Sequence, residues 1–237
     1  MSNPLTVSSN LSDSGPECAK ALSRNPAFRN FARRLLPAGI FIWVTLVAIG
    51  LWSLWGYENA PGEAGKPPQQ WPSVSRIQLN RSNPTLVMLA HPRCPCTRAS
   101  IAELARVMAH GQGRLSAYVL FIKPAGFDND WEHSDLWESA AGIPGVNVVS
   151  DPDGVEAGLF SAVTSGQTVL YNTGGQLIFS GGITGARGHH GDNAGESAII
   201  AILNATVPER NQTAVFGCPL FNPTFECQGT LDESKQY

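Results

Sequence analysis

The segment of residues 85–104 constrains the fold of this chain more than any other part of the sequence. An apolar, β-prone run at residues 85–90 stops just before Cys94-Pro95-Cys96, and a helical pattern follows the two cysteines. Apolar residues of that pattern recur at helical spacing, at Ile101, Leu104, Ala105 and Met108. The sequence therefore predicts a buried strand and an amphipathic helix with two thiols at their junction, close enough to form and break a disulfide.

The chain beyond this junction continues to alternate between strand and helix patterns. Besides the pair already described (85–90 and helix 97–109), strands are predicted at residues 115–122, 145–150, 168–171 and 176–180. Helices are predicted at residues 134–141, 155–162 and 194–205. Asn172-Thr-Gly-Gly175 lies between the last two strands and is typical of a hairpin turn. This order of elements indicates an α/β fold whose central sheet ends in a hairpin.

Residues 35–57 carry no charged side chain and predict one transmembrane helix. As a helix this run would be about 34 Å long, which matches a hydrocarbon core of about 30 Å. Four arginines precede it, whereas Glu58 and Glu63 follow it. The positive-inside rule then places the N-terminus in the cytoplasm and the rest of the chain on the outer side. A cleaved signal peptide is the alternative, but Pro61 follows Ala60 and disfavours cleavage there.

Composition and charge predict a single folded domain in the rest of the chain. The net charge of −3 and a charged fraction of 15% come without a basic patch outside the anchor's flank, so no nucleic-acid binding is expected. The predicted parts are listed in chain order: a disordered cytoplasmic segment at 1–34, the membrane helix at 35–57, a proline-rich linker at 58–73, the domain at 74–208, and a cysteine-containing tail at 209–237.

The Cys-Pro-Cys turn is the predicted catalytic centre. Pro95 suits the first position of a helix, so both thiols would lie at the positive end of the helix dipole. Arg93 and Arg98 are expected to favour the thiolate further. Cys94 precedes the helix, so we expect it to be the more exposed thiol and the nucleophile, with Cys96 as the resolving thiol. A structural disulfide is disfavoured because it would close almost no loop.

A glycine-rich loop at residues 181–193 supplies further candidates. It follows the last strand and contains Arg187, His189, His190 and Asp192. His189 and His190 are predicted catalytic groups, since a thiolate benefits from a nearby cation or proton shuttle. The alternative is that Asp192 or Asn193 caps the last helix and the histidines lie in water.

The strand, Cys-Pro-Cys turn and helix, followed by the terminal hairpin, resemble the thioredoxin fold over residues 85–205. The chain looks like the membrane-anchored, outward-facing thioredoxin-like proteins of bacteria, in the redoxin-type branch with an insert, here at residues 127–144. It departs from the Trp-Cys-x-x-Cys pattern, and Gln167 lies where that family carries a cis-proline. The resemblance implies a thiol–disulfide oxidoreductase without a cofactor, anchored in the inner membrane and acting on protein thiols and disulfides in the periplasm.

The same residues fit two other functions. Two thiolates and imidazoles suit copper or zinc, so Cys94, Cys96, His91, His189 and His190 form an alternative metal-ligand set. A weaker alternative is a thiol peroxidase, in which one thiolate attacks a peroxide and the other resolves the sulfenic acid.

The C-terminal tail holds Cys218 and Cys227 among several apolar residues. Together with Cys94 and Cys96 they make an even number of cysteines on the predicted oxidising side, whereas Cys18 lies on the cytoplasmic side. A Cys218–Cys227 disulfide is predicted. Exchange of Cys218 with Cys94 or Cys96 is the alternative, because four cysteines allow three connectivities.

Overall fold

The computed structural model describes residues 26–127 and 130–221, with side chains from residue 35. Its elements are α2 (Pro26–Asn59), β1 (Thr85–Ala90), α3 (Pro95–Gly111), β2 (Ser116–Lys123), α4 (Asp135–Ala141), β3 (Val146–Pro152), α5 (Val155–Leu159), β4 (Gln167–Tyr171), β5 (Leu177–Gly181) and α6 (Ala194–Leu203). The chain divides into two compact units between Trp55 and Gly56. Each unit is described by itself.

The first unit contains most of helix α2. From Leu35 to Asn59 this helix is long and apolar enough to cross a membrane, judged by length and composition alone. Its large apolar side chains are exposed along this stretch, Phe41 and Trp52 among them. A helix that is apolar on all sides and buries none of them within the protein fits a lipid environment.

The second unit is built on a five-stranded sheet with the order β3-β2-β1-β4-β5. Strands β1, β2 and β3 are parallel, whereas β4 is antiparallel to β1 and β5 is antiparallel to β4. The two crossovers between parallel strands run through α3 and α4, and a turn at Asn172 joins β4 to β5. Strand β1 lies at the centre of the sheet, so the turn that follows it is held by neighbours on both sides.

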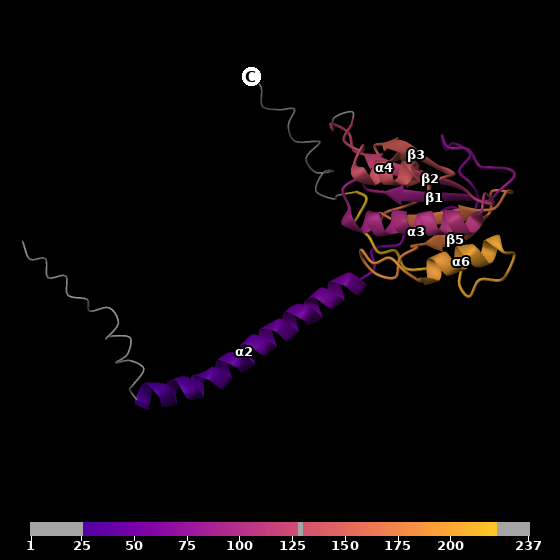
Figure 1. The fold of residues 1–237 in the computed structure, drawn as a ribbon. Coiled ribbons are helices and arrows are strands. Elements are labelled where there is room, and N and C mark those ends of the chain that lie inside the picture. The colour runs from indigo at the N-terminus through magenta and orange to yellow at the C-terminus, as the bar shows by residue number, and fades with distance from the viewer. Residues whose placement is uncertain (1–25, 128–129, 222–237) are drawn as a thin grey trace, which may run out of the picture. The chain divides into compact units, whose positions relative to one another are not determined.

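Two apolar cores cover the two faces of this sheet. Helices α3, α4 and α6 lie over one face, as Figure 1 shows, and pack there on side chains such as Met88 and Phe121. On the other face, Phe160 and Tyr171 pack with Trp71, which contacts both rings edge-on at centroid distances of 5.3 and 5.2 Å. Residues on β1 alternate between the cores, which explains why its sequence is continuously apolar.

The structure confirms the predicted α/β arrangement of a central mixed sheet flanked by helices. Helix α3 begins at Pro95, two residues before its predicted start, because the proline itself occupies the first turn. Helix α5 ends at Leu159, before Ser161 takes a positive φ of 51°. The segment between Asn59 and Val74, part of the predicted linker, makes defined contacts with the domain: Trp71 N–H, for example, donates to the Gly175 carbonyl.

Candidate functional site

The turn between β1 and α3 places two thiols at the start of a 17-residue helix. Cys94 is the residue that precedes the helix, in an extended conformation, and its carbonyl accepts the Thr97 N–H at 3.0 Å. Cys96 lies within the first turn of α3. Both sulfurs are therefore at the helix end where unpaired N–H groups and the macrodipole favour negative charge.

The tail brings a third thiol to this turn. The Sγ atoms of Cys94 and Cys218 are 3.0 Å apart, although the two residues are 124 positions apart in the sequence. The sulfurs of Cys94, Cys96 and Cys218 all lie within 4.8 Å of one another. We call these three residues the thiol cluster. The predicted pair Cys94 and Cys96 is thus brought together, and Cys218 joins it.

Main-chain hydrogen bonds hold the tail in this position. Ser165 N–H donates to the Cys218 carbonyl, and Leu220 N–H donates to the Val163 carbonyl, each at 2.8 Å. Thr164 and Pro219 form an antiparallel bridge between these bonds. The Leu220 side chain is buried in the core that contains Phe160 and Tyr171. The tail is therefore docked as a short extended segment rather than hanging free.

The predicted exposure of Cys94 is wrong. Its side chain is only 2% exposed, and that of Cys96 is 6% exposed, so Cys94 is not the more accessible of the two. The docked tail contributes to this burial, because it places the Cys218 sulfur 3.0 Å from the sulfur of Cys94.

The pKa values of the three thiols are shifted in different directions. The Cys218 thiol donates a hydrogen bond to the Cys94 sulfur and, with help from Thr97 and against the effect of burial, lowers the pKa of Cys94 to about 4. Burial and the neighbouring Cys94 charge raise the pKa of Cys96. The bond to Cys94 also raises the pKa of Cys218, which keeps its proton. At neutral pH the cluster therefore holds one thiolate, on Cys94, and two thiols.

Arg187 is the cation that the glycine-rich loop contributes to the cluster. Its guanidinium donates to the carbonyls of Gly217 and Ala60 and lies 5.2 Å from the ring of Tyr57. Its charge lowers the pKa of Cys96 and of Cys218, against the larger effects that raise them. Arg187 thus both fixes the residue before Cys218 and supplies positive charge.

Arg93 and Arg98, the arginines next to the cysteines in the sequence, contact other side chains. Arg93 is exposed, and its guanidinium lies 5.1 Å from the centre of the Trp131 ring. Arg98 is paired with Asp135 at an N–O distance of 2.5 Å. Each of these cations has a partner other than a thiol.

His189 and His190 are both exposed. His189 Nε2 is 3.5 Å from a carboxylate oxygen of Glu58. Among the residues that the structure describes, the one group close enough to hold a metal ion contains the three cysteines and no histidine. The predicted ligand set of two cysteines and three histidines is therefore not assembled in the described part of the chain.

His91 supports the turn rather than joining the cluster. Its backbone N–H donates to the Ser165 hydroxyl, and its Nδ1 accepts the Arg93 N–H. Burial lowers the pKa of the imidazole, and its ring contacts Trp131 edge-on. Ser165, which the sequence did not single out, also bonds the Thr97 hydroxyl at 2.7 Å and so joins the turn to the segment before β4.

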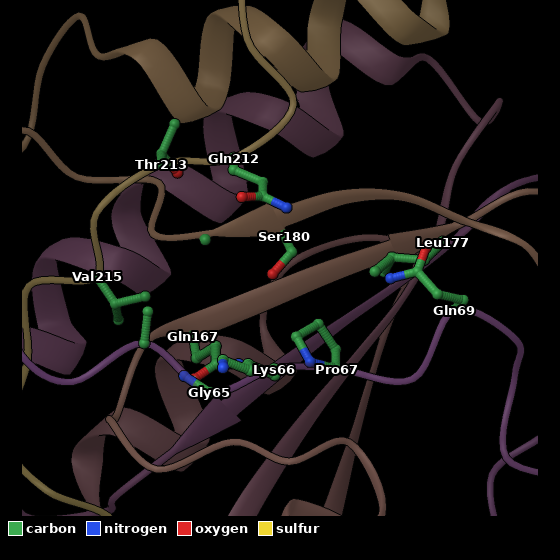
Figure 2. A pocket seen from close by; sticks show the side chains of 12 residues that line it. Gly65, Lys66, Pro67, Gln69, Gln167, Leu177, Ser180, Gln212, Thr213 and Val215 are labelled. Atoms are coloured by element: carbon green, nitrogen blue, oxygen red, sulfur yellow. The ribbon is translucent and has the colours of Figure 1, made fainter.

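Gln167 opens β4 opposite Leu89, and no cis peptide bond occurs among the described residues. Its Oε1 accepts the Gly65 N–H, whereas its buried Nε2 has no hydrogen-bond partner within residues 35–127 and 130–221. Gln167 also lines a cavity of about 460 Å³ beside β5; Figure 2 shows Ser180 between Gln167 and Gln212 there. None of the cysteines that the structure describes lines this cavity.

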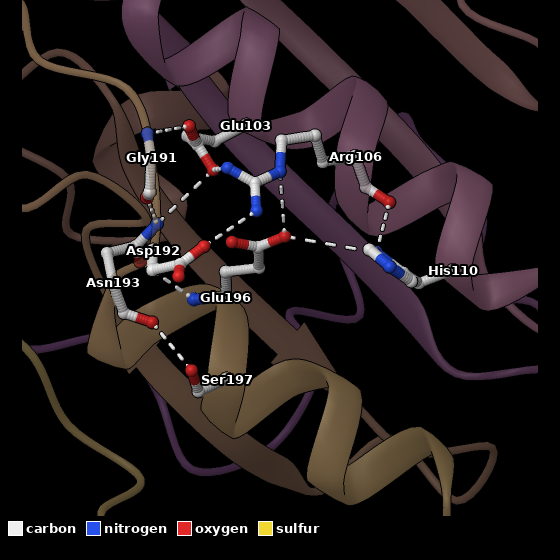
Figure 3. A network of polar contacts seen from close by, with 8 residues as sticks. All are labelled: Glu103, Arg106, His110, Gly191, Asp192, Asn193, Glu196 and Ser197. Carbon is white, nitrogen blue, oxygen red and sulfur yellow. Dashed lines mark hydrogen bonds and ion pairs between the residues drawn. The ribbon is translucent and has the colours of Figure 1, made fainter.

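A second polar cluster, built on two buried carboxylates, lies farther along α3, and Figure 3 shows its members. Glu103, whose side chain is fully buried, accepts the Gly191 N–H and pairs with Arg106. Arg106 also pairs with Glu196 on α6 and with Asp192. We call these four residues, Glu103, Arg106, Asp192 and Glu196, the charge clamp. Asn193 caps α6 by accepting the Glu196 N–H, as one of the sequence alternatives predicted.

Cys18 and Cys227 lie outside the described residues. The predicted Cys218–Cys227 disulfide therefore stays a prediction. The structure does place Cys218, whose sulfur lies 3.0 Å from the sulfur of Cys94.

No family model matches this chain, and neither does any curated protein. Solved structures do. An uncharacterised conserved protein from Geobacillus kaustophilus is 15% identical and covers 70% of this chain and 94% of its own, with a TM-score of 0.52. A hypothetical protein, SMc02350, from Sinorhizobium meliloti 1021 is 18% identical and covers 68% of this chain and 93% of its own, with a TM-score of 0.49.

A secreted disulfide oxidoreductase from Mycobacterium tuberculosis, described as homologous to Escherichia coli DsbE, is 16% identical over 42% of this chain and 68% of its own, with a TM-score of 0.35. The topology of the sheet, with its terminal hairpin and a Cys-Pro-Cys turn at the start of α3, identifies the domain as a thioredoxin-like fold.

Proposed function

We propose that this protein is a thiol–disulfide oxidoreductase in which Cys94 is the attacking thiolate. The observation that carries the proposal is the thiol cluster itself, three sulfurs within 4.8 Å at the start of α3. The thiolate rather than the thiol is the nucleophile in disulfide exchange. A pKa of about 4 keeps Cys94 ionised at neutral pH, while neighbouring thiols stand ready to complete the reaction.

The exchange reaction follows from these positions. The Cys94 thiolate attacks one sulfur of a substrate disulfide, and the broken bond leaves one substrate thiolate. A second thiol of the protein loses its proton and attacks Cys94 Sγ, which releases the other substrate thiolate. The substrate disulfide has then gained two electrons and the protein holds an internal disulfide. In the simplest form Cys96 is that second thiol, and the reverse sequence oxidises a substrate dithiol.

The spacing of Cys94 and Cys96 bears on the direction of exchange. A disulfide between residues separated by a single proline closes a small and restricted ring. Strained disulfides have higher reduction potentials than relaxed ones. A Cys94–Cys96 disulfide would therefore be a readily reduced one.

The proposed site of action is the periplasmic side of a bacterial inner membrane. Helix α2 from Leu35 to Asn59 would be the single anchor, with the arginine-rich N-terminus in the cytoplasm. Thiol–disulfide exchange with secreted or membrane proteins suits that compartment, because disulfides persist there. The proposed partners are accordingly protein thiols and disulfides.

A second candidate function is the binding of a soft metal ion. Three sulfurs within 4.8 Å of one another suit copper or zinc, which thiolates select. This version replaces the predicted histidines by Cys218. It requires deprotonation of all three thiols, and the raised pKa values of Cys96 and Cys218 oppose that.

Trapping of mixed disulfides tests the proposed function. The full-length Cys96→Ser/Cys218→Ser variant, expressed in a bacterial membrane and quenched with acid, is expected to accumulate mixed disulfides through Cys94. Both candidate resolving thiols are removed so that the trap does not depend on which one resolves. Adding Cys94→Ser should abolish the adducts.

Adducts that persist without Cys94 would remove its assigned role. The metal content of the purified wild-type protein decides between the two candidates. Stoichiometric copper or zinc that is lost in Cys94→Ser would favour metal binding over exchange.

A further inference from the structure

The docked tail holds the Cys218 sulfur at a fixed position beside Cys94. Residues 217–220 are held by two main-chain bonds, from Ser165 N–H to the Cys218 carbonyl and from Leu220 N–H to the Val163 carbonyl, and by the bond from Arg187 to the Gly217 carbonyl. These contacts fix the position of the Cys218 backbone and place its sulfur beside that of Cys94. A tail that served only as a cover would need apolar contact but no thiol at this position.

We propose that Cys218 is a redox-active thiol that forms a disulfide with Cys94, and that this long-range bridge, rather than Cys94–Cys96, is the oxidised resting form of the protein. The proposal rests on the proposed exchange function of Cys94. It names the resolving thiol and gives the tail a part in the reaction.

Distance and chain separation both favour this pairing. The two sulfurs are 3.0 Å apart, so a shift of about 1 Å brings them to the length of an S–S bond. A bridge between positions 124 residues apart restricts the unfolded chain far more than one between residues 94 and 96. It also avoids the small ring of the Cys-Pro-Cys pair. The Cys94–Cys218 disulfide is therefore expected to be the harder of the two to reduce.

The charges of the cluster set the order of events. While Cys94 is a thiolate, Cys218 is bonded to it and keeps its proton. When Cys94 enters a mixed disulfide its negative charge disappears, and with it the main cause that raises the pKa of Cys218. The positive charge of Arg187 remains and favours the Cys218 thiolate. Cys218 thus becomes a better nucleophile once Cys94 has reacted.

The reaction has two steps. A substrate disulfide and the Cys94 thiolate give a mixed disulfide and one substrate thiolate. Cys218 releases its proton to water and attacks Cys94 Sγ, the mixed disulfide breaks, and the second substrate thiolate leaves. Two electrons have passed to the substrate, and the protein carries Cys94–Cys218. Cys96 can later attack Cys94 Sγ and release Cys218, which rearranges the bridge without gain or loss of electrons.

Peptide mapping tests the pairing directly. The full-length protein in detergent, with Cys18→Ser and Cys227→Ser to remove the other thiols, is equilibrated in glutathione buffers, quenched with acid, alkylated and digested with trypsin. Cleavage after Arg93 and Arg98 yields a peptide of residues 94–98, and cleavage after Arg210 and Lys235 yields residues 211–235. A Cys94–Cys96 bridge leaves the first peptide alone and unalkylated, whereas Cys94–Cys218 joins the two peptides.

The expected result is the joined pair with Cys96 alkylated, in excess over the internal bridge by at least about tenfold, which corresponds to about 30 mV. Cys96→Ser should leave the pair intact, and Cys218→Ser should convert it to the internal bridge. A dominant Cys94–Cys96 bridge with alkylated Cys218 would overturn the inference and leave the proposed function standing. So would a Cys218–Cys227 bridge in the wild-type protein that persists while Cys94 exchanges. Failure of Cys94 to oxidise in any buffer would overturn both.

Discussion

Helix α3 contributes to two polar clusters that contain buried ionisable groups, and the negative charge of each cluster is stabilised in a different way. The charge clamp in the middle of the helix pairs Glu103 and Glu196 with the fixed cation Arg106. The thiol cluster in the first turn holds the Cys94 thiolate by a hydrogen bond from Cys218, another ionisable group. Burial raises the pKa of Glu196, and Arg106 opposes that rise.

The difference separates a structural cluster from a reactive one. An ion pair with a fixed cation has no proton to give up and no bond to exchange, so it joins α3 to α6 without further chemistry. A thiolate that is stabilised by a hydrogen bond from a second thiol loses that bond when either sulfur is oxidised. The sulfur of the second thiol is itself a nucleophile. Buried ionisable groups therefore indicate function where their partner can also react.

The largest expected effect is on the pH dependence of Cys94 alkylation. In reduced protein carrying Cys96→Ser, the rate should follow the thiolate, with a midpoint near pH 4 and a plateau above it. Cys218→Ala removes the S–H donor, so the pKa of Cys94 should rise by several units and the rate at pH 6 should depend steeply on pH. Iodoacetamide kinetics between pH 3 and pH 9 measure the midpoint.

Cys218→Ser is the matched control for this profile. Its hydroxyl can still donate to Cys94, so the midpoint should stay within about one unit of the wild-type value. The midpoint is the readout, because any change at position 218 also alters access to the sulfur. If Cys218→Ala leaves the midpoint unchanged, the cluster is not compensated by its own thiol and the contrast with the charge clamp fails.

Substitutions in the charge clamp should change the free energy of unfolding rather than the reactivity of Cys94. Glu103→Gln keeps the size of the side chain but weakens its acceptance from Gly191 N–H and its pairing with Arg106. Hydrogen bonds to a charged group contribute about 1.5–3 kcal/mol each, so the free energy of unfolding should fall by about that amount. Urea titration of the reduced protein measures the loss.

Glu138→Gln on the exposed face of α4 provides the comparison, with an expected change within about 0.5 kcal/mol. Neither glutamate variant should move the midpoint of Cys94 alkylation. A shifted midpoint in Glu103→Gln would mean that the two clusters are coupled.

Much of the fold could be predicted, because local patterns determine it. The continuous apolar run of β1 and the helical stripe of α3 gave both elements, and Pro95 marked the start of the helix. The meeting of Cys94 and Cys96 follows from their separation by a single residue. These features depend on neighbours in sequence, which a pattern can show.

The parts of the site that were missed depend on contacts between distant residues. The docking of the tail places Cys218 beside Cys94, and it rests on main-chain bonds to residues 163–165. Main-chain bonds leave no mark in the choice of side chains. The glycine-rich loop gave the right kind of residue at Arg187, whereas His189, two positions later, pairs with Glu58.

The smallest expected effect concerns the two arginines. Arg187→Met loses the bond to the Gly217 carbonyl, so the tail should detach more often and Cys94 alkylation at pH 7 should speed up by about tenfold, as expected for one hydrogen bond from a charged donor. Arg93→Met, which affects only an exposed contact with Trp131, should change the rate by less than about twofold. Equal effects of the two variants would contradict the role given to Arg187.

The most direct test of the central claim is a redox titration of Cys94 in the full-length protein. Glutathione and dithiothreitol buffers set the potential, and acid quenching followed by alkylation and mass spectrometry measures the oxidised fraction. We expect a reversible two-electron transition between about −120 and −270 mV, the range of working disulfide exchangers. No transition in that range, with the thiols protected by a co-purifying metal ion, would contradict the central claim.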